Sequence, residues 1–117
     1  MLIAHITSTS AWNAAQTTGS YTAASLQTEG FIHCSEFNTE QLLAVANFLY
    51  VGQPKLMVLL IESDHLTSEL RFEEFETSGK FFPHIYGPLN LEAVVEVLPF
   101  PPQSDGTFRL PDLHSPA

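Results

Sequence analysis

The chain has 117 residues, of which 44% are hydrophobic and 15% are charged, and this is the composition of a globular protein rather than a disordered one. Its formal net charge is −9 with only four Lys and Arg residues, which excludes the clusters of basic side chains that bind a nucleic-acid backbone or an anionic membrane surface. We therefore expect a single domain over residues 1–117 that binds neither nucleic acid nor membrane.

The cellular compartment is indicated by cysteine usage and by the start of the chain. Cys34 is the only cysteine, so no internal disulfide is possible, as is typical of a reducing compartment. No basic segment followed by an apolar one begins the chain, and the apolar run at residues 56–61 is too short to span a bilayer. These features predict a cytoplasmic protein.

The first elements are predicted to be a strand, a helix and a second strand. Residues 1–6 are apolar and partly β-branched, which favours a strand. Residues 11–18 are typical of a helix that ends at Gly19. Residues 19–29 are polar and irregular, and residues 30–35 are predicted to form the second strand.

The most regular pattern is that of a helix after Asn38. This residue is a good N-cap, and Gln41 three positions later completes a capping box. The spacing of one helix face is followed by Leu42, Val45, Ala46 and Leu49. We expect Gly52 and Pro54 to end the helix.

The second half of the chain is predicted to consist mainly of strands. Residues 55–62 are almost continuously apolar, which is typical of a central strand buried on both faces. Residues 70–75 alternate as in a strand with one exposed face, and residues 91–98 include an apolar, β-branched run. Residues 78–88 are rich in Gly, Pro and aromatic residues, and we expect a loop there.

The chain closes with a proline-rich extension, residues 99–117. Within it, Asp105-Gly106 predicts a tight turn and residues 108–110 a short strand. Two short-to-medium helices set among strands, followed by a run of strands, indicate an α+β fold with a split, mainly antiparallel sheet.

Histidines and hydroxyls recur together on two predicted strands. His5 and Thr7 share one face of the first strand, and His33 and Ser35 share one face of the second. A histidine in an apolar strand must be hydrogen-bonded or line a cleft, because burying it unpaired is costly. If the strands are neighbours, these side chains line one groove, to which His84 of the predicted loop can add. The alternative is that each histidine is satisfied separately and that the hydroxyls only cap helices.

Other candidate residues also have two interpretations. Arg71 and Glu73 share a strand face and can form one polar unit. Arg71 either pairs with a carboxylate of the protein or binds a phosphate or carboxylate of a ligand. Phe82 and Tyr86 lie in a segment whose aromatic rings either stack on a flat ligand or seal the core. Cys34 points away from His33 on its strand and is expected to be a small buried side chain rather than a nucleophile.

Longer motifs resemble a known bacterial family. Gly30-Phe-Ile-His-Cys-Ser, Phe82-Pro-His-Ile-Tyr-Gly-Pro-Leu and Asp105-Gly-Thr-Phe-Arg-Leu-Pro are similar to the family called domain of unknown function 952, and the resemblance covers nearly the whole chain. That family resembles a compact, divergent branch of the ADP-ribosyltransferase superfold, which includes the tRNA 2′-phosphotransferases. His5-Ile-Thr resembles the His-x-Thr motif on the first core strand of that group.

The resemblance implies NAD or a similar nucleotide as the ligand of an NAD-using transferase or glycohydrolase. The ligand-binding residues that it implies are His5, Thr7, Ser35, Arg71, Phe82 and Tyr86. The catalytic residues that it implies are His33, His84 and Glu73. They would take a proton, orient the nucleophile or stabilise a developing oxocarbenium charge. With two arginines in all, the chain does not suit an enzyme that holds RNA phosphates.

Two other functions fit the same residues. A non-catalytic module that binds a nucleotide or another small metabolite would need the cleft but no acid or base. A metal-dependent hydrolase would use His5, His33 and His84 as ligands, as in three-imidazole zinc sites. The spacing of these histidines matches no recognised metal motif, and we expect no metal.

Overall fold

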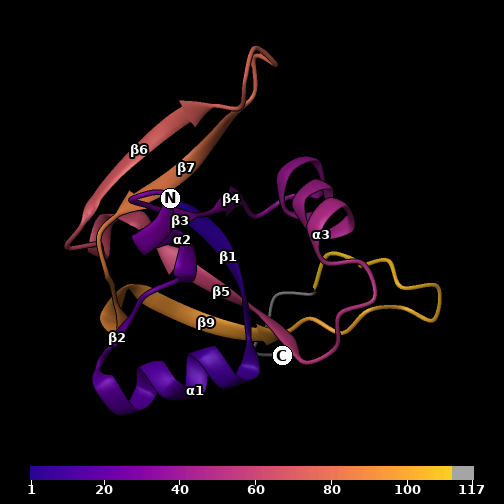
Figure 1. Ribbon diagram of the computed structural model, residues 1–117, viewed down its shortest axis with the longest axis horizontal. Helices are drawn as coiled ribbons and strands as arrows, with labels where there is room; N and C mark the ends of the chain where they lie inside the picture. Colours follow the sequence, from indigo (N-terminus) through magenta and orange to yellow (C-terminus); the bar gives the residue numbers. More distant parts are fainter. Residues whose placement is uncertain (112–117) are drawn as a thin grey trace.

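The apolar run predicted as a central strand forms β5, Leu56–Glu62, in the middle of the main sheet of the computed structural model, which describes residues 1–111. It pairs with β1, Leu2–Ser8, on one side and with β9, Val94–Pro99, on the other. β4, Ser35–Glu36, adds to β1, so the strand order is β4-β1-β5-β9 and every pairing is antiparallel (Figure 1). β5 is buried on both faces, as its sequence predicts.

Side chains of β1 and β5 alternate between two apolar cores, one on each face of the main sheet. Ile3 and Leu59 belong to the core that is covered by α1, Thr9–Thr18. Val58 belongs to the core that is covered by α3, Ala44–Leu49, through its buried Ala46. Sequence alternation therefore determines which side chain of each strand faces which core.

The helix α1 ends at Gly19 as its sequence predicts, but it begins at Thr9 and not at residue 11. The Ser8 hydroxyl accepts a hydrogen bond from the Ala11 N–H at 3.1 Å, and Gly19 ends the helix in the left-handed conformation with φ 90°. Residues 19–29, expected to be irregular, contain the two-residue strand β2, Ser20–Tyr21, and the short helix α2, Ala24–Thr28. β2 pairs with β8, Leu89–Asn90.

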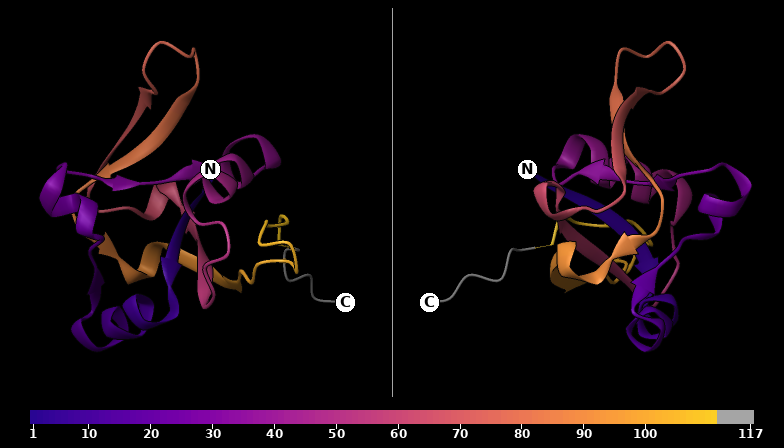
Figure 2. Two further views of the ribbon diagram at one scale, coloured as in Figure 1. Left: turned by 45° about the vertical axis from the view of Figure 1, so that its right-hand side comes forward. Right: turned by 90° about the vertical axis from the view of Figure 1, so that its left-hand side faces the viewer.

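A second, three-stranded antiparallel sheet has the order β3-β7-β6. Its strands are β3, Ile32–His33, β7, Phe81–Tyr86, and β6, Glu69–Glu74. The hairpin of β6 and β7 extends beyond the body of the molecule in all three views (Figures 1 and 2). Pro83 and Ile85 of β7 are buried in the hairpin, while most side chains of β6 and those near the hairpin tip are exposed.

The prediction of a loop at residues 78–88 is wrong, because β7 is the central strand of this sheet. Pro83 argued against a central strand, since proline has no N–H to donate. The Pro83 carbonyl accepts a hydrogen bond from the Cys34 N–H at 3.0 Å, so its ring nitrogen also faces the β3 side, just where β3 ends. The missing donor therefore costs the β6–β7 ladder nothing.

The strand predicted at residues 30–35 is divided between the two sheets. Its first part is β3, which pairs with β7, and its second part begins β4, which pairs with β1. Cys34 lies between them with its backbone bonded to Pro83. One apolar segment thus crosses from one sheet to the other, which residue spacing alone does not reveal.

The helix predicted after Asn38 is present, with a wider first turn. Residues Thr39–Leu43 form a π-helical turn that leads into α3, and the Asn38 side chain accepts from the Gln41 N–H at 2.8 Å. The second half of the predicted capping box is wrong. The Gln41 side chain instead accepts from the Glu36 N–H at 2.9 Å and donates to the Phe81 carbonyl at 2.8 Å. It therefore ties the main sheet to β7.

The proline-rich extension follows β9 without a further strand in its described part. Gly106 has the positive φ of 89° that its predicted tight turn requires. Residues 108–110 form no strand, and instead the Phe108 ring stacks on Phe100 with centroids 4.7 Å apart. Residues 112–117 of the predicted extension lie outside the described part of the chain.

The predicted α+β class with antiparallel sheets and a few short helices is confirmed. No helix within residues 1–111 is long and apolar enough to cross a membrane.

The Gln41→Glu variant should be destabilised although it keeps the side-chain shape. A carboxylate can still accept from Glu36, but it cannot donate to the Phe81 carbonyl, which is left facing an anion. We expect the free energy of unfolding in urea to fall by about 1–3 kcal/mol. The same substitution at the exposed Gln16 of α1 serves as the control, and equal losses in both variants would contradict the bridging role.

Candidate functional site

The three histidines singled out in the sequence lie together. His5 places Nδ1 2.6 Å from the backbone carbonyl oxygen of His33, which joins β1 to β3. His33 and His84 are direct cross-strand partners on β3 and β7, and their ring centroids are 5.3 Å apart. The three histidines are therefore neighbours, as expected, but of the three only His5 and His33 line the neighbouring cleft.

A hydrogen-bonded chain holds His5 in the wall of the site. Its Nε2 lies 2.7 Å from the Tyr21 hydroxyl oxygen, which in turn lies 2.8 Å from the Thr7 hydroxyl oxygen. A carbonyl only accepts, so Nδ1 must carry a proton to donate to His33. In the neutral ring Nε2 then accepts the Tyr21 proton, and Thr7 donates to Tyr21.

Burial keeps His5 neutral. Its side chain is almost fully buried, and desolvation lowers the pKa of His5 to about 4, outweighing the carbonyl of His33, which raises it. Burial also raises the pKa of Tyr21 above its ordinary value. His5, Tyr21 and Thr7 are therefore uncharged near neutral pH, with the tautomer of His5 determined by the His33 carbonyl.

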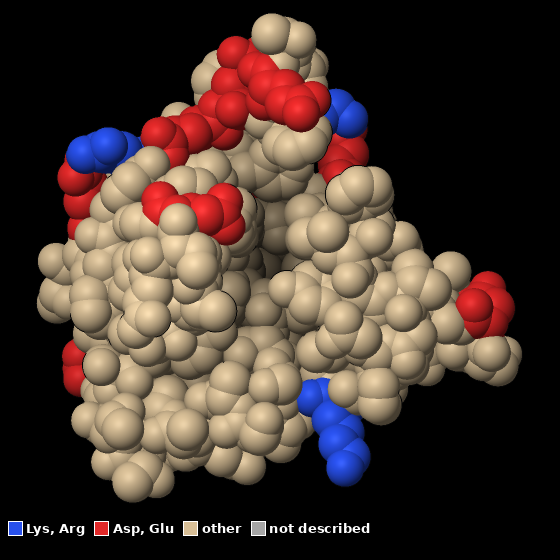
Figure 3. Space-filling view, in the orientation of Figure 1, with Lys and Arg blue, Asp and Glu red and all other residues tan. Residues whose placement is uncertain are grey.

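A cleft of about 320 Å³ opens beside this chain. Its polar side chains come from β1, β2, α2, β3 and the segment after α3. They include His5, Thr7, Ser8, Tyr21, Ser25, His33, Tyr50 and Gln53. The face shown in Figure 3 is hollowed at its middle, in the region between α2 and the α3 end of the molecule. This volume is at the lower end of the range for small-molecule sites.

His33 lies in the cleft lining with a carboxylate partner. Its Nε2 is 3.0 Å from a carboxylate oxygen of Glu29, and both side chains are about half exposed. When Nε2–H donates to Glu29, Nδ1 is the nitrogen that accepts a proton. The pair is thus an imidazole positioned for general acid–base chemistry at the cleft.

His84 forms a second imidazole–carboxylate pair. Its Nδ1 lies 2.7 Å from Glu73 Oε1, which also accepts the Tyr86 hydroxyl proton. These two hydrogen bonds, the one from Tyr86 first and then the one from His84, hold the pKa of Glu73 below its ordinary value. Phe31 stacks on the His84 ring with centroids 4.1 Å apart and contacts the edge of His33. Two His–Glu pairs therefore lie side by side around one phenylalanine.

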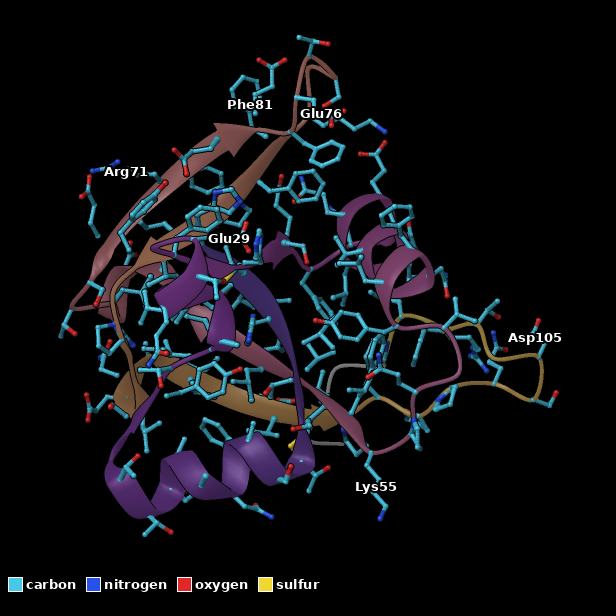
Figure 4. The ribbon with its side chains drawn as sticks, viewed as in Figure 1. Glu29, Lys55, Arg71, Glu76, Phe81 and Asp105 are labelled. Carbon is cyan, nitrogen blue, oxygen red and sulfur yellow. The ribbon has the colours of Figure 1, made fainter. Side chains whose placement is uncertain are left out.

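Arg71 pairs with a carboxylate, as one of its two interpretations predicts, but this carboxylate is Glu69 and not Glu73. The Arg71 guanidinium donates twice to Glu69, at 2.9 and 3.0 Å, and lies over the Tyr86 ring 4.3 Å from its centroid. Glu73 is occupied by His84 and Tyr86. Figure 4 shows Arg71 at the outer edge of β6, away from the cleft.

Ser35 does not share the groove with His5, and that expectation is wrong. Ser35 pairs directly with Ala4, so both side chains lie on the face of the main sheet opposite to His5 and Thr7. Phe82 lies on the same face of β7 as His84, but its ring contacts Phe75 near the hairpin tip. Cys34 is buried as expected, and burial raises the pKa of its thiol.

Sequence reasoning missed Tyr21, Glu29 and Phe31. Tyr21 and Glu29 belong to a segment without periodicity, and the partners they contact are distant in sequence or on another element. Only Phe31 carried a signal, as part of the Gly30-Phe-Ile-His motif. Within residues 1–111 no group of three or more His, Cys, Asp and Glu side chains is arranged to hold a metal ion.

Comparison with known proteins agrees with the expected family. A family model described as "Protein of unknown function (DUF952)" matches residues 6–97. The chain belongs to this family. It is similar to the crystal structure of protein CC0527 from Caulobacter crescentus, with 31% identity, a TM-score of 0.84 and coverage of 94% of this chain and 95% of that one. The solution NMR structure of CC0527 gives 33% identity, a TM-score of 0.77 and coverage of 91% and 90%. No curated protein matches significantly.

The buried neutral His5 should make this DUF952 protein less stable in mild acid. Because the folded pKa of about 4 lies below the unfolded value of about 6.5, the unfolded chain takes up the proton first. The contribution of neutral His5 to the free energy of unfolding is present above pH 6.5 and is lost as the pH falls towards 4. The loss amounts to roughly 3 kcal/mol. Urea unfolding at several pH values measures it.

The His5→Gln variant removes this titration while keeping one donor and one acceptor. Its free energy of unfolding should vary less between pH 6.5 and 4 than that of the wild type. His65→Gln, at an exposed position after β5, should leave the wild-type slope unchanged. Equal slopes for the wild type and His5→Gln would contradict the burial of a neutral imidazole.

Proposed function

We propose that the protein is an enzyme that acts on NAD or another ADP-ribosyl or nucleotide compound bound in the cleft. The observation that carries the proposal is the pair of His–Glu units, His33–Glu29 and His84–Glu73, whose imidazole rings lie 5.3 Å apart at the edge of a cleft of small-molecule size. A His–Glu pair on the surface seldom acts in catalysis by itself. Here His33 lines the cleft, and the ring of His84 packs against the ring of His33.

In this proposal the buried chain forms the ribose contact. The Thr7 and Tyr21 hydroxyls in the cleft wall bind ribose hydroxyls. His5 is a positioning residue, since both of its ring nitrogens already bond to His33 and Tyr21. Arg71 and Tyr86 extend the same face of the second sheet on one side of His84, and Phe82 extends it on the other side towards the hairpin tip. A longer ligand would lie on this face.

The chemistry proposed is cleavage of an N-glycosidic bond. The C1′–N bond breaks and its electron pair leaves with the nicotinamide ring. An acceptor oxygen, from water or an alcohol, forms the new bond to C1′, and its proton passes to Nδ1 of His33. Glu29 stabilises the imidazolium that results. The His84–Glu73 pair adds negative charge next to the positive C1′ of an oxocarbenium-like transition state.

The resemblance of His5-Ile-Thr to the His-x-Thr motif of ADP-ribosyltransferases supports the same proposal, and with it an ADP-ribosyltransferase-like fold. The motif lies in the first strand of the main antiparallel sheet, with His5 and Thr7 in the cleft lining.

The proposal is tested by calorimetry with NAD and by assay of nicotinamide release. Wild-type protein should bind NAD and release nicotinamide. His33→Gln should lower the rate by about 10²–10⁴, the usual contribution of a general acid or base. His84→Gln should also lower it, while His65→Gln should not. Flat heats at millimolar NAD with no nicotinamide release would overturn the proposal.

A second candidate function is a non-catalytic binding module for the same ligands. It is favoured by His5, whose two ring nitrogens are committed to protein partners and offer no acid or base to a ligand. Binding of NAD by the wild type, with no nicotinamide release and with weaker binding by His33→Gln, would support this function instead.

A further inference from the structure

The size of the cleft limits which part of a dinucleotide it can hold. Its volume of about 320 Å³ is close to the lower limit of about 300 Å³ for small-molecule sites, whose range reaches about 1,000 Å³. A nucleoside matches this size, whereas a dinucleotide would have to extend over the open surface. The cleft is therefore closer in size to one nucleoside than to a dinucleotide.

The cleft has no permanent positive charge to offer a phosphate. None of the residues that line it is Lys or Arg. The four basic residues of the chain, Lys55, Arg71, Lys80 and Arg109, are not part of the lining, although Lys55 stands between the lining residues Gln53 and Leu56 in the sequence. Lys55 extends from the foot of the molecule in Figure 4, and Arg71 is bound by Glu69. Phosphate sites in proteins are usually built on such side chains.

Backbone donors at the start of α1 do not replace the missing cations. The start of α1 borders the cleft, but its Thr9 N–H donates to the Lys55 carbonyl at 2.9 Å and its Ala11 N–H donates to the Ser8 hydroxyl at 3.1 Å. Two of the N–H groups that could bind an anion at this helix end are thus already used.

The charge on the His33 side of the cleft is negative. Glu29 lies beside His33, and Glu73 lies beyond it against His84. Acidic side chains also gather over the β6–β7 hairpin, above the hollow of the face in Figure 3. Phe31 adds an aromatic ring in contact with both histidines. Carboxylates and an aromatic face together favour a flat ring with positive charge and repel a phosphate.

We propose that the cleft selects a nucleoside with a positively charged ring, such as a pyridinium riboside, over its phosphorylated forms. This inference rests on the proposed function, because it assigns the part of the nucleotide that the same site recognises. The bond presented to His33 is then the N-glycosidic bond of a cationic nucleoside, and the phosphate end of any longer ligand lies outside the cleft.

The experiment is calorimetric titration of the full chain with nicotinamide riboside, nicotinamide mononucleotide and ADP-ribose. Nicotinamide riboside should bind at least as tightly as either phosphorylated compound. The mononucleotide, which differs from it by one phosphate, should bind about fivefold or more weakly, as expected for one repulsive charge contact. Raising the salt concentration should reduce this difference.

A gain-of-charge variant makes the test sharper. Gln53 is an exposed residue of the cleft lining, so Gln53→Lys places a cation there. It should strengthen binding of the mononucleotide relative to the riboside by about fivefold or more. Gln16→Lys adds the same charge on the exposed face of α1, outside the cleft, and should change the ratio much less.

The outcomes separate this inference from the proposed function. Tighter binding of nicotinamide mononucleotide or ADP-ribose than of the riboside by the wild type would overturn the selectivity and leave the proposed function standing. A ratio unchanged by Gln53→Lys would also overturn the placement of the ligand in this cleft. No binding of any of the three compounds at millimolar concentration would overturn both.

Discussion

The hydrogen bond from His5 Nδ1 to the His33 carbonyl is the interaction on which the candidate site depends. It joins the main sheet to the second sheet at the point where the chain crosses between them, and it satisfies a buried polar ring. Because a carbonyl can only accept, this single contact also determines the tautomer of His5. The direction of the hydrogen bonds through Tyr21 and Thr7 follows from it.

The same contact brings His33 and His84 together. The His33 carbonyl is directed to His5, and the Cys34 N–H is directed to β7, so His33 and His84 form a non-hydrogen-bonded cross-strand pair. Side chains are closest in such pairs. Each imidazole then has its own carboxylate, Glu29 from the end of α2 or Glu73 from β6, and the two pairs differ in exposure. The more exposed ring, His33, lines the cleft, whereas the less exposed ring, His84, lies outside its lining.

Backbone pairing explains why a proline-rich aromatic segment could form the central strand of the second sheet. Pro83 occupies a position whose nitrogen faces the side where β3 ends, while its carbonyl still binds Cys34. The side chains that follow Pro83 then alternate between the polar face, at His84 and Tyr86, and the core, at Ile85. A segment that reads as a loop from its composition thus supplies both a core strand and half of the candidate site.

The sequence by itself determined the local elements that hydrophobic periodicity and capping dictate, namely β1, α1, β5 and the Asn38 cap, and it determined that His5 and Thr7 share a face. It also carried the motifs that identify the family. Only the tertiary structure decided that Ser35 lies on the opposite face, that Glu29 and Glu73 each pair with a different histidine, and that Tyr21 completes the buried chain. The physical reason is that strand spacing determines the direction of a side chain relative to its own strand. Which strands become neighbours, and which distant donor satisfies a buried acceptor, depends on how the two sheets pack.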